Sequence, residues 1–362
     1  MTPKLYRNPR AQTHTLRTSQ NPARDFHRKL FSSHSPTPLT SLPSIAKEIG
    51  VAHVFVKDES LRFGLPAFKI LGASWATFCV LAQRLEIKIE DIDLDAFKEQ
   101  LRCRGEGLTL YTATDGNHGR AVARVAALLD LKSKIFVPAA VSELSRDRIR
   151  SEGAEVVVVQ ADYDEAVKMA AVEAGDHGIL IQDTAWPGYE EIPRLIVQGY
   201  TTLFSEVDER LVEEDLQPSL VVVPVGVGSL AHSAVQFYRS ESYPPLQGPP
   251  PSILTVEPDT AACLNTSLHA GQSTPIETGY TIMPGLNCGT VSSTAWPDLH
   301  AGVDLSVVAS DTEALKAMED LNDLGIQAGP CGAAPLAALR ALPSDVLDGS
   351  MVVVLICTEG QM

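Results

Sequence analysis

Residues 220–231 have the sequence Leu-Val-Val-Val-Pro-Val-Gly-Val-Gly-Ser-Leu-Ala, an apolar run that leads into a glycine-rich loop. A continuous run of Val and Leu is typical of a strand buried on both faces, as in parallel sheets covered by helices. The loop that follows opens an apolar helical segment, and backbone amides at a helix N-terminus bind anions well. This stretch therefore predicts an α/β fold with a phosphate-binding loop at a strand end.

The same loop also fits G-x-G-x-x-A, the fingerprint of dinucleotide-binding sites. That interpretation requires an acidic residue about 20 residues further on, at the end of the next strand. The proline-rich stretch 243–251 occupies that distance, and Glu257 comes later than expected. We therefore predict a monophosphate site and no NAD site.

Short β-rich runs alternate with helical runs from Pro38 onward. Helical periodicity lies between the runs, and Asp162 and Asp311 are the expected N-caps of two helices. The order β-α-β-α predicts an α/β protein with mostly parallel, twisted sheets. The predicted strands cover residues 54–57, 109–113, 134–138, 155–160, 179–182, 220–225, 253–257, 305–309 and 351–357.

The composition is that of an ordinary globular protein. The chain has 362 residues, of which 44% are apolar and 20% charged, and its net charge is −16. An acidic chain repels nucleic acid and anionic membranes, so neither is an expected partner. No apolar run approaches the roughly 18 residues of a transmembrane helix. The six cysteines show no C-x-x-C spacing, which predicts no metal site and a reducing, cytoplasmic location.

The N-terminal region is basic. The first 45 residues hold seven Lys or Arg and a single acid, Asp25, a composition that also resembles a transit peptide. We favour a basic N-terminal arm over residues 1–35.

Lys69 opens an apolar helix in the stretch Phe68-Lys69-Ile70-Leu71-Gly72-Ala73. A lysine at a helix start opposes the helix dipole, which favours the neutral, nucleophilic amine that Schiff-base chemistry needs. The alternative is an ordinary surface lysine that keeps its ammonium in water. Taken alone, this stretch favours the surface lysine.

Residues 114–120, Thr-Asp-Gly-Asn-His-Gly-Arg, lie between a predicted strand and a predicted helix. The glycines let the backbone approach a ligand, Asn117 can donate from its amide, and Asp115 can act as a base or an anchor. The alternative is a polar turn that only caps the next helix. The density of functional groups favours a site.

Two further polar segments follow strands, namely Gln182-Asp183-Thr184-Ala185-Trp186 and Cys357-Thr358-Glu359-Gly360. The first can equally be a loop with packed aromatic side chains. Ligands of open α/β sheets bind at the carboxyl ends of strands. We therefore expect the ends of four strands, followed by residues 114–120, 182–186, 226–229 and 357–360, to converge on one crevice.

The motifs in series resemble a known family. F-K-I-L-G-A at 68–73, T-D-G-N-H-G at 114–119, G-V-G-S-L-A at 226–231 and T-E-G at 358–360 resemble the fold type II pyridoxal-phosphate enzymes, the tryptophan synthase β-like group. Other segments are similar to the diaminopropionate ammonia-lyases within that group: F-V-K-D-E-S at 55–60, R-F-G-L-P-A-F-K at 62–69, Q-D-T-A-W at 182–186, V-E-P at 256–258 and G-L-N-C-G at 285–289. The resemblance covers about residues 21–360.

This resemblance implies a cofactor, pyridoxal 5'-phosphate, and a two-lobed fold. Residues 36–362 would form the catalytic core, with a smaller lobe of roughly residues 72–190 inserted in a larger one. Lys69 would bind the cofactor covalently and handle the α-proton, and Asp115 and Asp183 would be further acid/base groups. The remaining cofactor-binding residues would be Asn117 beside the phenolic oxygen, Gly226, Val227, Gly228 and Ser229 at the phosphate, and Thr358 at the pyridine nitrogen.

The implied reaction is α,β-elimination of 2,3-diaminopropionate, or of a similar β-substituted amino acid, to pyruvate and ammonia. Such an enzyme would be a carbon–nitrogen lyase and a homodimer acting on a small-molecule substrate. An amino-acid racemase, a β-replacement enzyme and an inactive cofactor-binding relative remain alternatives on the same scaffold.

Overall fold

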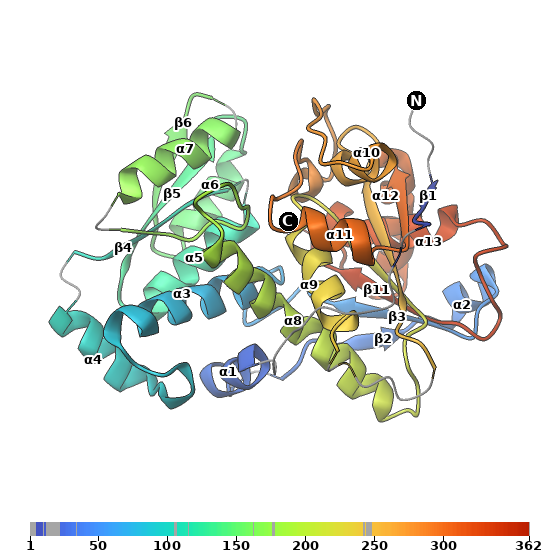
Figure 1. Ribbon diagram of the computed structural model, residues 1–362, viewed down its shortest axis with the longest axis horizontal. Coiled ribbons are helices and arrows are strands. Elements are labelled where there is room, and N and C mark those ends of the chain that lie inside the picture. Colours follow the sequence, from blue (N-terminus) through green and yellow to red (C-terminus); the bar gives the residue numbers. More distant parts are fainter. Residues whose placement is uncertain are drawn as a thin grey trace. The chain divides into compact units, whose positions relative to one another are not determined.

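The computed structural model describes residues 5–9, 11, 22–33, 35–104, 107–114, 116–161, 163–175, 178–241, 243 and 248–361 (Figure 1). The chain divides into two compact units. The first unit comprises Met1–Asn21, Ser35–Phe68 and Thr201–Met362, and the second comprises Pro22–His34 and Lys69–Tyr200. Helix α8 (Glu191–Val212) supplies residues to both units, because the division falls within it.

The first unit is built on a seven-stranded sheet among the described residues, in the order β1-β10-β9-β8-β11-β3-β2. The edge strands β1 and β2 run antiparallel to their neighbours, and the strands between them are parallel. Its strands are β1 (Leu5–Arg7), β2 (Leu39–Ser41), β3 (His53–Asp58), β8 (Leu220–Pro224), β9 (Ser252–Pro258), β10 (Leu305–Ala309) and β11 (Val352–Cys357).

The apolar runs form the centre of this sheet. Every residue of β8 and β11 is buried, and the two strands pair in parallel with Val353 opposite Leu220. Helix α13 (Pro330–Ala341) packs on β8, β9, β10 and β11, and its small side chains complete the core. This burial on both faces is what the Val-rich sequence predicts.

The second unit holds a separate four-stranded parallel sheet, in the order β6-β5-β4-β7. Its strands are β4 (Thr109–Ala113), β5 (Lys132–Pro138), β6 (Glu155–Val159) and β7 (Ile179–Leu180). Helix α5 (Asn117–Leu128) contacts β4, β5 and α3 (Ile70–Leu85), and α7 (Tyr163–Ala174) contacts β4, β5 and β7. Figure 1 shows these helices around the green sheet.

The remaining helices connect and cover the sheets. Helix α1 packs onto α3, where the ring of Phe26 meets Trp75 and Phe78 edge-on. Residues 89–91 and 284–286 form 3-10 turns. The helices not yet named are α1 (Pro22–Leu30), α2 (Pro43–Ile49), α4 (Leu94–Arg104), α6 (Glu143–Arg150), α9 (Ser229–Tyr238), α10 (Cys263–Ala270), α11 (Trp296–Gly302) and α12 (Asp311–Asp323).

The predicted α/β class with mostly parallel sheets is confirmed, and a strand is found in each of the nine predicted runs. The burial expected of continuous valine runs fails for Val156–Val159, because β6 is an edge strand and Val156 and Val157 are only half-buried. A run of valines therefore does not by itself identify a central strand. The lobe boundaries stay a prediction.

The expected cap of α12 is also wrong. Ser310 is the N-cap, and with Glu313 it forms a reciprocal capping box. Asp311 instead accepts hydrogen bonds from the Thr281 hydroxyl (2.6 Å) and the Ile282 amide (3.1 Å). The other predicted cap, Asp162, lies outside the described residues.

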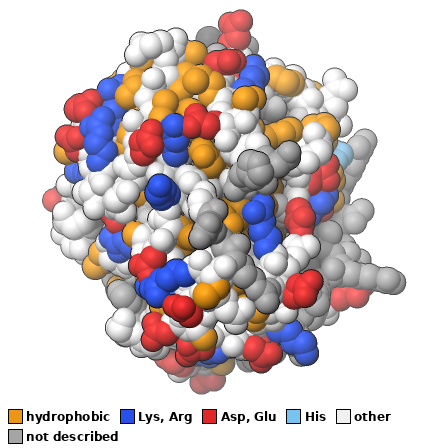
Figure 2. Space-filling model, turned by 90° about the vertical axis from the view of Figure 1, so that its left-hand side faces the viewer, with side chains coloured by type: hydrophobic (Ala, Val, Ile, Leu, Met, Phe, Trp, Pro, Cys, Tyr) orange, Lys and Arg blue, Asp and Glu red, His pale blue; other side chains and the backbone are white. Residues whose placement is uncertain are grey.

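The exposed charges are of both signs. Figure 2 shows a face on which acidic and basic side chains lie next to one another. Among the described helices, none combines the length and the apolar character that crossing a bilayer requires.

Candidate active site

Lys69 lies at the start of α3 in the second unit. Its Nζ donates to Oδ2 of Asp183 at 2.6 Å, and the two side chains are 23% and 7% exposed. The sequence shows no acid near Lys69; Asp183 comes from the segment after β7, 114 residues along the chain. The structure thus brings together two of the predicted site residues.

Close packing of helices fixes the start of α3. A Cβ atom at Gly72 would lie 2.6 Å from the Tyr200 ring and 2.7 Å from Ile196, both on α8. A Cβ at Gly199 would lie 2.5 Å from the Leu71 carbonyl oxygen. These distances are too short for a Cβ atom at either position. The two glycines therefore let α8 lie directly against the turn of α3 that follows Lys69.

Gln182 holds Asp183 in place. Its Oε1 accepts from the Thr112 hydroxyl (2.8 Å) and the Ala113 amide (3.0 Å), and its Nε2 donates to Tyr163 (2.7 Å). These bonds join the end of β7 to the end of β4, where residues 114–120 begin. Sequence reasoning quoted Gln182 within its motif but assigned it no role.

His118 completes this group. Its Nε2 lies 2.8 Å from the Ile181 carbonyl oxygen, so Nε2 carries the proton, and Nδ1 faces Oδ2 of Asp183 at 3.8 Å. Burial lowers the pKa of His118, which keeps the imidazole neutral. Burial alone would raise the pKa of Asp183, but the charge of Lys69 and its hydrogen bond to Asp183 hold that pKa at about 2.

This pair predicts a pH effect on the cofactor-free protein. A carboxyl whose folded-state pKa falls from 3.8 to about 2 stabilises the fold by about 2 kcal/mol above pH 4. That contribution is lost as the pH falls from about 4 toward 2. We expect urea unfolding to show Asp183→Asn less stable than the parent at pH 7, with the difference shrinking at pH 3. The control Glu165→Gln, at an exposed position of α7, should change stability by less than about 0.5 kcal/mol. A pH-independent difference would contradict the assignment.

The segment after β4 turns sharply into α5. The Thr114 hydroxyl accepts from the amides of Gly116 (2.9 Å) and Gly119 (3.1 Å), so Thr114 organises this turn. Asn117 is the first residue of α5 and is partly exposed. Asp115 lies outside the described residues, so its role stays a prediction.

The glycine loop lies in the first unit, between β8 and α9. Gly228 has φ +96°, a conformation that side chains disfavour, and a Cβ there would lie 2.9 Å from Leu299. A Cβ at Gly226 would lie 2.8 Å from the Gly285 carbonyl oxygen. The Val227 carbonyl accepts from Ser292 (2.9 Å), which fixes the middle of the loop. Backbone amides in the first turn of a helix point out of its N-terminus and attract anions, so the loop that leads into α9 suits a phosphate group.

Thr358 follows β11, the neighbour of β8 in the first sheet, and is 5% exposed. Its carbonyl accepts from the Phe68 amide at 3.3 Å, one residue before Lys69 in the chain. Helix α13 supports this segment closely, since a Cβ at Gly332 would lie 2.6 Å from the Glu359 carbonyl oxygen.

The predicted site residues therefore form two groups on two different sheets. The ends of β4 and β7 lie next to each other in the second unit, and those of β8 and β11 in the first. Strand pairing joins these ends two by two, and their convergence on one crevice stays a prediction.

The chain matches a known protein family over most of its length. Residues 30–358 match the family described as "Pyridoxal-phosphate dependent enzyme". The chain is 36% identical to the diaminopropionate ammonia-lyase of Salmonella typhimurium over 92% of this chain and 87% of that protein. The Escherichia coli diaminopropionate ammonia-lyase is also 36% identical. A crystal structure of that enzyme in complex with D-serine superimposes with a TM-score of 0.89 and 32% identity, over 98% of this chain and 93% of that chain.

The chain therefore belongs to the pyridoxal-phosphate dependent enzymes. Within them it is similar to the diaminopropionate ammonia-lyases of two bacteria. Another crystal structure of the Escherichia coli enzyme, in complex with an aminoacrylate-PLP azomethine reaction intermediate, superimposes with a TM-score of 0.87. The predicted family, the fold type II architecture and the cofactor are confirmed.

The described residues fit pyridoxal phosphate. Lys69 offers a largely buried primary amine, residues 226–229 offer a loop at a helix N-terminus that admits no side chain at Gly226 or Gly228, and Thr358 offers a hydroxyl at a strand end. These are the three kinds of group that an aldehyde, a phosphate and a ring nitrogen require.

Proposed function

We propose that this chain catalyses the elimination of 2,3-diaminopropionate, or a similar β-substituted amino acid, to pyruvate and ammonia. The observation that carries the proposal is the agreement in sequence and fold with diaminopropionate ammonia-lyases over nearly the whole chain. A screen of amino acids for pyruvate release by the cofactor-loaded protein tests it. Exchange of the α-hydrogen for deuterium without pyruvate would instead indicate a racemase, and an added nucleophile appearing in the product would indicate β-replacement.

Each group has a task in this proposal. When bound, pyridoxal phosphate withdraws electrons from the α-carbon of the substrate. Lys69 would supply the amine that holds the cofactor covalently, and the free amine would take the α-proton of the substrate. The Thr358 hydroxyl, which carries no negative charge, would lie at the ring nitrogen of the cofactor. The Asn117 amide would donate to the phenolic oxygen.

Asp183 is the supporting acid near the substrate amine. It is ionised in the described structure because Lys69 lies beside it, so it can hold an ammonium group in the same place. The phosphate is held by Gly226, Val227, Gly228 and Ser229, chiefly through backbone amides. Departure of the β-amine requires a proton, which a positioned acid can deliver.

Asp115 is proposed as a second base, on the face of the substrate opposite Lys69. Asp115→Asn separates this role from helix capping, because Asn caps nearly as well but cannot take a proton. We expect a folded, yellow variant whose turnover falls by about 10²- to 10⁴-fold with one enantiomer and less with the other. Pyruvate release from each enantiomer measures this, and near-normal rates with both would make Asp115 a structural residue.

We further propose that the enzyme is a cytoplasmic homodimer. Free thiols at all six cysteines suit a reducing compartment. Dimerisation is an expectation from the family resemblance, and sedimentation velocity of the full chain measures it.

A further inference from the structure

Five buried polar groups in the first unit form a cluster that the proposed mechanism does not use. None is more than 7% exposed. The members, here called the Arg62 cluster, are Thr37, Lys57, Glu59, Arg62 and Glu206.

Arg62 is the centre of the cluster. Its guanidinium donates to both oxygens of Glu59 (2.7 and 2.6 Å) and to both oxygens of Glu206 (2.9 and 2.7 Å). Lys57 donates to Glu206 and to the Thr37 carbonyl, each at 2.7 Å. Two cations therefore face two anions, and the charges cancel.

Stability alone is a weak reason for such a cluster. Burying ions costs several kcal/mol each, and well-packed apolar side chains often serve as well or better. What the ions provide is geometry, because a guanidinium that bonds two carboxylates is fixed in position and orientation.

The fixed position of Arg62 constrains the backbone segment that leads to Lys69. Arg62 and Leu65 exchange backbone hydrogen bonds of 2.8 and 2.9 Å in a tight turn, where Phe63 has φ +51°. The Pro66 carbonyl then accepts from the Gly360 amide at 3.0 Å. The Phe68 amide bonds the Thr358 carbonyl, so residues 62–68 are tied at one end to the cluster and at the other to residues 358–360.

We propose that the Arg62 cluster is a positioning device for the cofactor lysine. It fixes the backbone of residues 59–68 and thereby the point from which the Lys69 side chain extends. The inference rests on the proposed role of Lys69. Arg62, Glu59 and Glu206 are positioning residues, since they act through Lys69.

The test is the double variant Arg62→Met/Glu59→Gln of the full chain. It removes one charge of each sign and leaves the 2.7 Å pair of Lys57 and Glu206. Two quantities are measured. One is the rate at which added pyridoxal phosphate becomes bound to Lys69, followed by absorbance and by borohydride reduction with peptide mapping. The other is the affinity for 4'-deoxypyridoxine phosphate, an analogue without the aldehyde.

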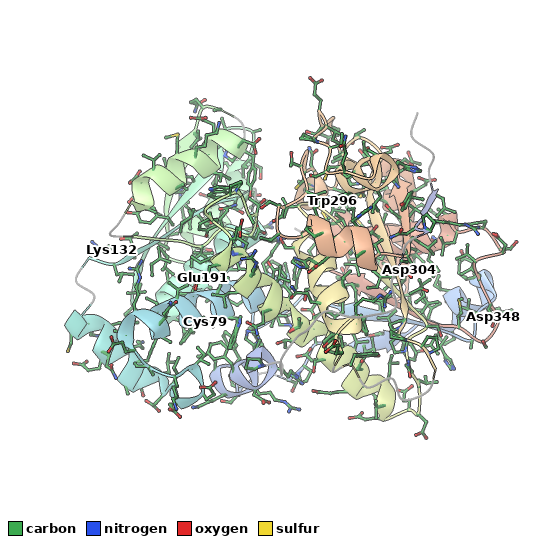
Figure 3. The ribbon with its side chains drawn as sticks, in the orientation of Figure 1. Cys79, Lys132, Glu191, Trp296, Asp304 and Asp348 are labelled. Atoms are coloured by element: carbon green, nitrogen blue, oxygen red, sulfur yellow. The ribbon has the colours of Figure 1, made fainter. Side chains whose placement is uncertain are left out.

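A matched control removes another buried ion pair of the same unit. Arg239, 3% exposed, donates to Asp304 at 2.6 Å, and Figure 3 labels Asp304. This pair joins the end of α9 to residue 304, just before β10, and lies far along the chain from residues 59–68. Arg239→Met/Asp304→Asn therefore tests the loss of a buried ion pair without the loss of positioning.

We expect the cluster variant to form the covalent link at least about tenfold more slowly, while its affinity for the analogue stays within about twofold. The control variant should match the parent in both measurements. The inference is overturned if the cluster variant forms the covalent link at the parent's rate, or if the control variant is slowed as much as the cluster variant. It is also overturned if the cluster variant loses as much affinity for the analogue as it loses in the rate of link formation. If the double variant fails to fold, Arg62→Lys, which keeps the charge but loses the fork, is measured in the same way, and unchanged link formation there overturns it too. Labelling of another lysine in the parent would instead refute the role of Lys69.

Discussion

Lys69→Ala loses the covalent link to pyridoxal phosphate and at least about a thousandfold in turnover, because one residue supplies both the amine that binds the cofactor and the base at the α-carbon. Borohydride reduction followed by peptide mapping measures the link, and pyruvate release measures the turnover. The variant should still fold, since Lys69 is a helix-end residue whose side chain is 23% exposed.

Lys168→Ala is the control for this prediction. Lys168 lies in the second unit with a side chain that is 70% exposed, and it pairs with Glu165 on the same helix at 3.3 Å. We expect normal labelling of Lys69 and normal turnover. Labelling of a different lysine in the parent, or substantial turnover in Lys69→Ala, would show that the assignment is wrong.

Gly228→Val weakens cofactor binding by about a hundredfold, whereas Ser229→Ala weakens it by less than about tenfold. The valine must adopt φ +96° and place its Cβ 2.9 Å from Leu299, so the loop has to move. The left-handed conformation alone costs roughly 1–2 kcal/mol for a side chain. Ser229→Ala removes one donor with a net value of about 0.5–1.5 kcal/mol. Equilibrium titration with pyridoxal phosphate measures both affinities.

Gly271→Val is the control, since Gly271 also has a positive φ of +69° but a Cβ there has open space. It reproduces the backbone strain at the end of α10, away from the loop in sequence. We expect a loss of stability with near-normal cofactor affinity. Equal small effects of Gly228→Val and Ser229→Ala would argue against a phosphate loop at residues 226–229.

Local sequence predicted the long buried elements well. β8 and β11 were recognisable because burial on both faces requires continuous apolar runs. β1 and β2 could not be predicted, since each has only three residues and pairs through its backbone at a sheet edge. The two-lobed fold was expected from the family resemblance, whereas the residues alone could not assign each strand to its sheet, because a valine run shows burial but not which strand will be its neighbour.

In the candidate site, too, local sequence indicates local conformation but not which distant residues come into contact. Glycine spacing identified the loop at Gly226 and Gly228 because backbone conformation is a local property. The pairing of Lys69 with Asp183 joins residues 114 positions apart, and the Arg62–Glu206 contact spans 144 positions. Only the fold brings such groups together, so sequence alone proposed Asp183 from family resemblance and assigned no role to Arg62.

The proposed elimination of 2,3-diaminopropionate is tested by incubating the cofactor-loaded full chain with this compound and measuring pyruvate and ammonia together. We expect two ammonia molecules for each pyruvate, since both nitrogens leave the substrate. The Lys69→Ala variant should release neither product. Exchange of the α-hydrogen without pyruvate, from this substrate and from other β-substituted amino acids, would contradict it.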